Sequence, residues 1–258
     1  LFFIAVGLTL LKPDNWTNPA TGGFAPNGLS GIGAGAAIIF FSYIGFDAVS
    51  TAAEESKDPG KDMPFGIIMS LAICTVLYIA LSAVMTGIAP WQTLGTAEPM
   101  ITALTFADGP PRLLSASRFI ISLGAVIAMF SVLLVFQLGQ PRIFMSMSRD
   151  GLLPPFLAKV HPKFKTPYVG TILTGIFVGV FAAFANIAEV VDLTNIGTLF
   201  AFVLVSLGVI VLRYKEPERV RPFRVPFVPW TPMISIVACL YLMFKLPKVT
   251  WERFGIWL

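Results

Sequence analysis

The sequence predicts an all-α protein that crosses a membrane several times, because it is poor in charge, rich in apolar residues and divided into long uncharged runs. Of its 258 residues, 56% are hydrophobic and only 12% are charged, and the mean hydropathy is +0.81. A water-soluble domain carries roughly 25% charged residues, which its wetted surface requires. The apolar runs are continuous and do not alternate with polar residues, and this pattern is typical of membrane helices.

Six stretches of the chain contain no Asp, Glu, Lys or Arg: 15–46, 63–97, 119–141, 166–188, 193–212 and 225–244. A helix needs about 20 apolar residues to cross roughly 30 Å of hydrocarbon. We therefore expect one crossing in each stretch, at about 31–54, 64–89, 117–140, 167–186, 192–212 and 229–246. The apolar ends, 1–11 and 251–258, are expected to be partial helices, so that residues 1–258 form a single membrane domain cut from a longer protein.

Basic residues are divided unequally between the two sets of loops. The loops at 54–64, 139–166 and 213–224 hold twelve Lys and Arg residues, whereas the loops on the opposite side hold six. The positive-inside rule therefore places the first set in the cytoplasm. The net charge of +4 is a topology signal, and since the basic residues are scattered over separate loops, no nucleic-acid partner is expected.

The most informative segment lies in the middle of the first expected crossing. Ser42, Tyr43, Gly45 and Asp47 place two hydroxyls, a glycine and an acid within six residues. A glycine weakens a helix, and a carboxylate at membrane depth is costly unless it meets water, a partner or a helix N-terminus. These residues favour a discontinuous helix whose first half ends near Tyr43 and whose second half begins near Asp47. A continuous packed helix with a capped or snorkelling Asp47 is the alternative.

A break at this point would expose backbone groups that can bind a ligand. The carbonyls of Phe41, Ser42 and Ile44 could accept hydrogen bonds from an ammonium group or an ion, and the amides that open the second half could attract a carboxylate. Asp47 or Ser50 could cap that second half.

Enzyme chemistry and metal binding have little support in the sequence. An aspartyl intramembrane protease needs two carboxylates at membrane depth, whereas Asp47 has no such partner and Asp192 lies at the boundary of a crossing. The sequence holds no metal-ligand motif. We therefore expect no enzyme, no metal and no cofactor.

Two stretches carry a family resemblance. FFSYIGFDAVSTAAEESKDPGKDMP at 40–64 closely resembles the sixth transmembrane helix and following loop of the amino acid-polyamine-organocation (APC) permeases, and GQPRIFMSMSRDGLLP at 139–154 is similar to the segment after their helix eight. Within that superfamily the chain looks most like bacterial relatives of the cationic amino acid transporters. The resemblance implies a LeuT-type inverted-repeat fold, of which this chain is the C-terminal half, from the end of helix 5 to the start of helix 12.

The resemblance also implies roles for particular residues. In these permeases the unwound part of helix six contacts the α-amino group of the substrate through backbone carbonyls, which implies Phe41, Ser42 and Ile44 here, with Gly45 allowing the break and Tyr43 either facing the pocket or packing. Asp47 is a candidate helix cap or coupling residue. Ser131 aligns approximately with a hydroxyl near the cation position of sodium-coupled members, although it could also bond to its own i−4 carbonyl. Since Phe130 precedes Ser131 where those members often have a second hydroxyl, proton coupling or exchange is favoured.

The implied function is secondary active transport of amino acids across the cytoplasmic membrane by alternating access, as proton-coupled symport or exchange. The expected partners are an amino acid substrate, a proton or counter-substrate, the lipid bilayer and the missing N-terminal half of the same transporter. A polyamine or organic-cation exchanger of the same superfamily, and a channel or noncatalytic membrane subunit, are the alternatives.

Overall fold

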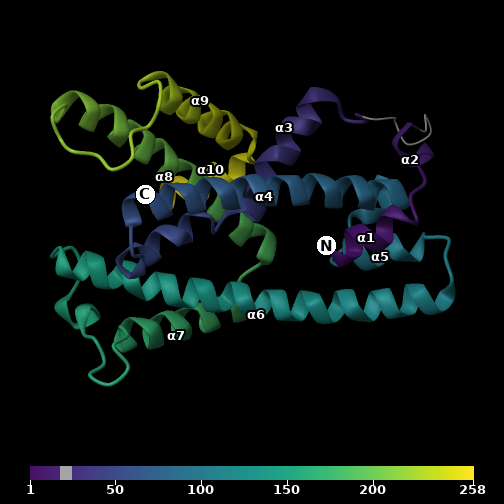
Figure 1. Ribbon diagram of the computed structural model, residues 1–258, viewed down its shortest axis with the longest axis horizontal. Coiled ribbons are helices and arrows are strands. Elements are labelled where there is room, and N and C mark those ends of the chain that lie inside the picture. Colours follow the sequence, from purple (N-terminus) through teal and green to yellow (C-terminus); the bar gives the residue numbers. More distant parts are fainter. Residues whose placement is uncertain (18–24) are drawn as a thin grey trace. The chain divides into compact units, whose positions relative to one another are not determined.

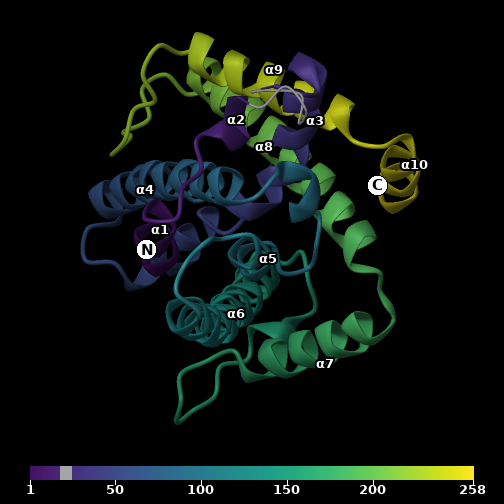
Figure 2. The same cartoon turned by 90° about the vertical axis from the view of Figure 1, so that its right-hand side faces the viewer.

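The structure is a computed structural model that describes residues 1–17 and 25–258. Within these ranges the chain folds into helices joined by loops, with no β-strand, and this confirms the predicted all-α class. Figure 1 traces the helices along the chain and Figure 2 shows them from the side. In chain order the elements are α1 (Phe2–Leu8), α2 (Asp14–Thr17), α3 (Gly28–Ile39), η2 (Phe40–Tyr43), η3 (Asp47–Glu55), α4 (Pro59–Ile88), η4 (Trp91–Leu94), α5 (Pro99–Thr105), α6 (Pro111–Arg149), η5 (Pro155–Ala158), α7 (Tyr168–Phe184), α8 (Ile187–Lys215), α9 (Trp230–Lys245) and α10 (Lys248–Trp257), where η denotes a 3-10 helix.

Four helical segments of the described chain are long and apolar enough to cross a membrane: Gly28–Thr51, Pro59–Ile88, Pro111–Arg149 and Glu189–Lys215. Helices α9 and α10 meet at 113° and count as a fifth only when they are taken as one bent span. Helix α7 has 17 residues, which reach roughly 26 Å at the α-helical rise, just short of the hydrocarbon thickness. The membrane crossings that the sequence predicts at α7 and at α9 therefore remain proposals.

Large apolar side chains point outward along these helices. Ile79 on α4, Phe130 on α6 and Phe177 on α7 are all more than half exposed. A helix in water buries its apolar stripe and exposes its charged face, whereas these helices expose apolar side chains to what surrounds them. The chain is a multi-pass membrane protein.

Several helix boundaries differ from the sequence prediction. Helix α4 begins at Pro59 instead of residue 64 and α6 at Pro111 instead of residue 117, and two further differences have a structural cause. Helix α6 was expected to end near residue 140 but continues to Arg149, with Pro141 inside it. Proline lacks the N–H that an interior turn uses, yet the ring of Pro141 is buried beside Gly170 of α7, whose lack of a side chain leaves room for it. Helix α8 begins at Ile187 instead of residue 192, although charged residues open it.

The acidic residues at the start of α8 are paired with α10. Glu189 forms an ion pair with Arg253 at 3.0 Å, and the Asp192 carboxylate accepts a hydrogen bond from the Thr250 hydroxyl at 3.4 Å. Negative charge is also favourable near a helix N-terminus. The charges that suggested a loop therefore lie inside the first turns of the helix.

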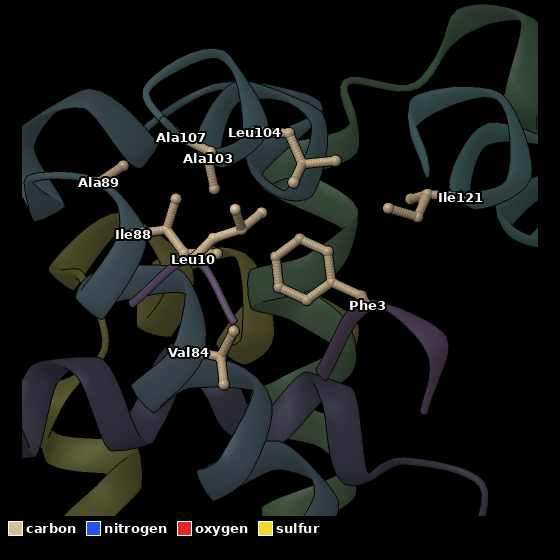
Figure 3. Packing of buried hydrophobic residues seen from close by; sticks show 9 residues of the cluster. All are labelled: Phe3, Leu10, Val84, Ile88, Ala89, Ala103, Leu104, Ala107 and Ile121. Atoms are coloured by element: carbon tan, nitrogen blue, oxygen red, sulfur yellow. The ribbon is translucent and has the colours of Figure 1, made fainter. Parts of the chain in front are cut away.

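The chain divides into two compact units, which are described separately. The first comprises residues 1–28 and 69–136, and the second comprises residues 29–68 and 137–258, so the boundaries fall within α4 and α6. The apolar core of the first unit joins α1, α4, α5 and α6, and its side chains point toward one another in Figure 3. Its buried members are Phe3, Leu10, Val84, Ile88, Ala89, Ala103, Leu104, Ala107 and Ile121.

The core of the second unit forms around α8 and α9, which lie side by side (Figures 1 and 2). Helix α3 and helix α10 add to it, so the stretch that leads to the helix break is packed against α8. The buried members are Ala37, Ile196, Leu199, Val203, Cys239, Met243, Leu246 and Phe254.

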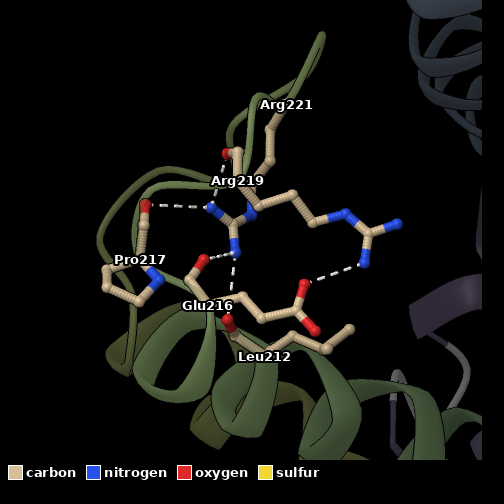
Figure 4. A network of polar contacts seen from close by, with 5 residues as sticks. All are labelled: Leu212, Glu216, Pro217, Arg219 and Arg221. Atoms are coloured by element: carbon tan, nitrogen blue, oxygen red, sulfur yellow. Dashed lines mark hydrogen bonds and ion pairs between the residues drawn. The ribbon is translucent and has the colours of Figure 1, made fainter.

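Arg221 closes the C-terminal end of α8. Its guanidinium donates hydrogen bonds of 2.7–3.3 Å to four backbone carbonyls (Figure 4), those of Leu212, Glu216, Pro217 and Arg219. The last carbonyls of a helix have no partner within the helix. Arg221 therefore caps α8 and folds the loop that follows back onto its end.

Replacing Arg221 with alanine should loosen this loop without unfolding the protein. Four carbonyls would lose charged donors, but all four bonds are exposed and water replaces most of each, so we expect a net loss of about 1.4 kcal/mol. Hydrogen exchange of the amides at 216–224 should rise about tenfold. The control is Arg219→Ala, which removes one exposed ion pair with Glu216 at 2.9 Å and should change exchange little. Equal effects of the two variants would contradict the capping role.

Candidate functional site

The first membrane-length segment of the second unit is interrupted where the sequence predicts a break. The α-helical part ends at Ile39, a 3-10 turn follows to Tyr43, and the next helix begins at Asp47. Between them Ile44 is extended, with φ −61° and ψ 129°, and Gly45 has φ +117°. Only glycine adopts such a positive φ without strain. The continuous helix is therefore excluded, and Gly45 is the residue that permits the change of direction.

The backbone groups at the break are only partly released. The Ile44 N–H donates to the Phe41 carbonyl at 3.1 Å, and the Ala48 N–H donates to the Gly45 carbonyl at 3.1 Å. The Phe41 carbonyl, expected to be released, is instead engaged, because the chain tightens into a 3-10 turn before it unwinds. The Ile44 carbonyl has no hydrogen-bond partner among residues 1–17 and 25–258. A carbonyl oxygen has two lone pairs, so that of Phe41 can still accept a second donor.

The side chains around the break differ in exposure. Phe41 is 40% exposed and Ser42 is exposed as well, whereas Tyr43, Ile44 and Gly45 are half-buried. The candidate residues 41–45 thus form one short, accessible stretch of the second unit.

The Asp47 carboxylate forms a hydrogen bond with a residue that precedes it in the chain, and it does not cap η3, the helix that begins at Asp47. Its Oδ1 accepts a hydrogen bond from the Gly45 N–H at 3.2 Å, and the N-cap position of η3 is Phe46, without a side-chain cap. Ser50 does not cap η3 either, since its hydroxyl donates to the Asp47 carbonyl at 2.6 Å. The expected caps are therefore wrong in detail. The negative carboxylate still lies in the first turn of η3, where the helix dipole favours it.

Helix α8 contacts the segment on both sides of the break. The Phe202 ring packs against Phe40 before the break, at 6.1 Å between ring centroids, and against Phe46 after it, at 5.6 Å. Phe46 thus packs on the scaffold. Two turns before Phe202, the buried Asn195 amide donates to the Ala37 carbonyl of α3 at 3.2 Å. The sequence alone gives no sign of these contacts, because they join segments about 160 residues apart.

Ser131 lies in the first unit. Its hydroxyl is exposed and donates to the Ile127 carbonyl of the same helix at 3.0 Å. This is the i−4 bond that serine commonly forms inside helices. In the described part of the chain, no three His, Cys, Asp or Glu side chains come together in a way that could hold a metal ion.

For the full-length transporter that the family resemblance implies, we expect uptake that does not require Na⁺, and Ser131→Ala should not change this. Phe130 precedes Ser131 at the position where sodium-coupled members of the superfamily often have a second hydroxyl. Uptake into vesicles with Na⁺ replaced by choline would test the expectation. A Na⁺ requirement that disappears in Ser131→Ala would show instead that the hydroxyl binds a cation.

The apolar helices and their outward-facing apolar side chains define a multi-pass membrane protein, and the chain belongs to the amino acid permease family, whose sequence profile matches residues 1–254. Over its full length it is 50% identical to the methylthioribose transporter of Bacillus subtilis (strain 168) and 47% identical to the branched-chain amino acid permease BcaP of the same organism, covering 54% of each. It is 41% identical over 221 residues to the vacuolar cationic amino acid transporter 4 of Arabidopsis thaliana. The matched region covers 85% of this chain and 36% of that protein. The chain spans about half the length of the Bacillus relatives that it matches.

Proposed function

We propose that this chain forms the second half of a secondary active transporter that carries amino acids across the cytoplasmic membrane by alternating access. The break at Tyr43–Asp47 in a membrane-length helix, within a chain of the amino acid permease family, carries the proposal. In secondary transporters, substrates bind where helices are discontinuous near the middle of the bilayer. The twelve basic residues in one set of loops favour a cytoplasmic position for these loops. The LeuT-type inverted repeat is the arrangement that we propose for the intact protein.

The charge of the break favours the ammonium end of an amino acid. The Ile44 carbonyl has no partner among the described residues, and an ammonium group has three N–H donors to offer to it and to neighbouring carbonyls. The opposite, amide-rich side of the break already holds a negative group of the protein, the Asp47 carboxylate on the Gly45 N–H. The carboxylate of the substrate is therefore expected to bind elsewhere, on the half of the transporter that lies outside this chain.

Substrate identity has a second candidate, because one relative at 50% identity is named a methylthioribose transporter. A sugar derivative would offer hydroxyl donors to the same carbonyls. The names of the other relatives point to branched-chain and cationic amino acids. Proton-coupled symport or exchange is the mode that we propose, with polyamine or organic-cation exchange and a channel as alternatives.

Transport by the full-length protein in proteoliposomes would test the proposal. Labelled leucine, arginine, methylthioribose and putrescine would be offered separately, with and without an inward proton gradient. A carrier of amino acids should accumulate at least one amino acid above equilibrium or exchange it in counterflow. Simple equilibration of the labelled compound would indicate a channel. Accumulation of methylthioribose or putrescine alone would show that this compound, and not an amino acid, is the substrate.

A further inference from the structure

Asn195 is a polar side chain buried in an apolar cluster. It is 0% exposed, and so are its neighbours Ile196 and Leu199 on the same helix. Burying an amide is unfavourable unless its donors and acceptors find partners. The Nδ2 atom donates to the Ala37 carbonyl at 3.2 Å, but the Oδ1 atom has no partner among the described residues.

This arrangement gives little to stability alone. An unsatisfied buried acceptor costs about 1–3 kcal/mol, whereas an apolar side chain of the same shape avoids that cost. The single bond from Nδ2 offsets only part of it. The contact that Asn195 makes is therefore better explained by the position that it gives to α3 than by a contribution to the free energy of folding.

Ala37 lies in the last turn of α3, directly before the break. The last four carbonyls of an α-helix have no donor four residues later within that helix, and the following 3-10 turn changes the hydrogen-bond spacing from four residues to three. Ala37 is itself fully buried, so water cannot serve its carbonyl. The Asn195 amide supplies a donor from another helix at the point where the α-helical pattern stops.

The same face of α8 also contacts the segment beyond the break. Phe202 lies seven residues, or two turns, after Asn195, and its ring touches Phe40 and Phe46. Asn195 fixes the backbone of the first half by a hydrogen bond, and Phe202 packs on both halves. A rotation of α3 about its axis would break the bond from Asn195 and turn the carbonyls of residues 41–45 with it.

We infer that Asn195 is a positioning residue of the substrate site: from α8 it fixes the last turn of α3 and thereby orients the carbonyls that receive the ammonium group of the substrate. The inference rests on the proposed function. Asn195 acts through Ala37 and has no need to contact the substrate.

The test is the Michaelis constant of uptake in the full-length transporter with Asn195→Leu. We expect KM to rise about tenfold, because the loss of one well-placed hydrogen-bond acceptor weakens substrate binding by about that factor. Thermal stability in detergent should change little, because the unsatisfied Oδ1 is removed while the Ala37 carbonyl loses the donor from Asn195. Asn195→Ala gives the same readout without added bulk in case leucine is not accommodated.

Ser206→Ala is the matched control. Ser206 lies on the same helix, and its hydroxyl bonds to Ser235 of α9 at 3.2 Å, so the variant removes an interhelical bond that does not involve α3. It should leave KM unchanged. A purely structural role for Asn195 predicts lower stability and less protein in the membrane with an unchanged KM, and this result would overturn the inference.

A third variant separates this inference from the proposed function. If Gly45→Leu abolishes uptake while both Asn195 variants keep the wild-type KM, the broken-helix site stands and the positioning role is wrong. If Gly45→Leu transports normally, the broken-helix site is wrong and the role of Asn195 falls with it.

Discussion

Uptake by the full-length transporter should be abolished when Gly45 is replaced with leucine, although the protein should still insert into the membrane. Gly45 has φ +117°, a region that L-residues rarely adopt. Such a conformation costs about 1–3 kcal/mol for a residue with a side chain. The chain would relieve this strain by changing φ, which would rotate the peptide that carries the Ile44 carbonyl away from the site. Initial rates of uptake, divided by the amount of transporter in the membrane, would measure the loss.

Gly151 provides a matched control for backbone strain. It also has a positive φ, +79°, and a Cβ atom added there would meet no atom within 4 Å apart from its chain neighbours. Gly151→Leu therefore adds a comparable conformational cost in a loop remote in sequence from the break, and uptake should persist. Normal uptake by Gly45→Leu would show that the geometry of the break is not needed for transport.

Asp47→Ala should lower uptake by roughly five- to a hundredfold, whereas Asp47→Asn should retain a substantial part of it. The carboxylate oxygen holds the Gly45 N–H at 3.2 Å, and the asparagine side chain keeps an oxygen that can accept the same bond. Alanine leaves that N–H without its partner and frees the turn, at a cost of about 1–3 kcal/mol, which corresponds to a factor of up to about a hundred. The measurement is again uptake per inserted transporter.

The comparison of the two Asp47 variants separates geometry from charge. If the hydrogen bond alone matters, asparagine is tolerated and the dependence of uptake on a proton gradient is unchanged. If Asp47→Asn is as damaging as Asp47→Ala, the negative charge itself takes part, and coupling at Asp47 becomes the explanation. Uptake with and without an imposed proton gradient would distinguish the two.

The position of the break could be predicted from the sequence because its causes are local. A glycine, two hydroxyls and an acid close together in an uncharged run are costly in a continuous membrane helix, and the interruption between Tyr43 and Asp47 follows from them. The fold class was predictable for a similar reason, since long uncharged runs permit few other structures in a membrane. Residues 41–45 as the substrate contact remain a prediction.

Features that depend on distant partners could not be predicted. Nothing in the sequence around Asn195 indicates its contact, since its amide bonds to Ala37, 158 residues earlier. The start of α8 was placed too late because Glu189 and Asp192 resemble loop residues until Arg253 and Thr250 are seen beside them. Asp47 resembles an N-cap by position alone, and only the turn at Gly45 brings the amide back to its carboxylate.

The form of the second half of the broken helix has a mechanical consequence. The nine residues Asp47–Glu55 are wound as a 3-10 helix, which is long for this conformation. A 3-10 helix rises about 2.0 Å per residue and an α-helix about 1.5 Å, so rewinding this segment would shorten it by roughly 4.5 Å and turn its far end by about half a revolution. One stretch of backbone could thus convert a change at the break into a combined shift and rotation of the loop that begins at Ser56.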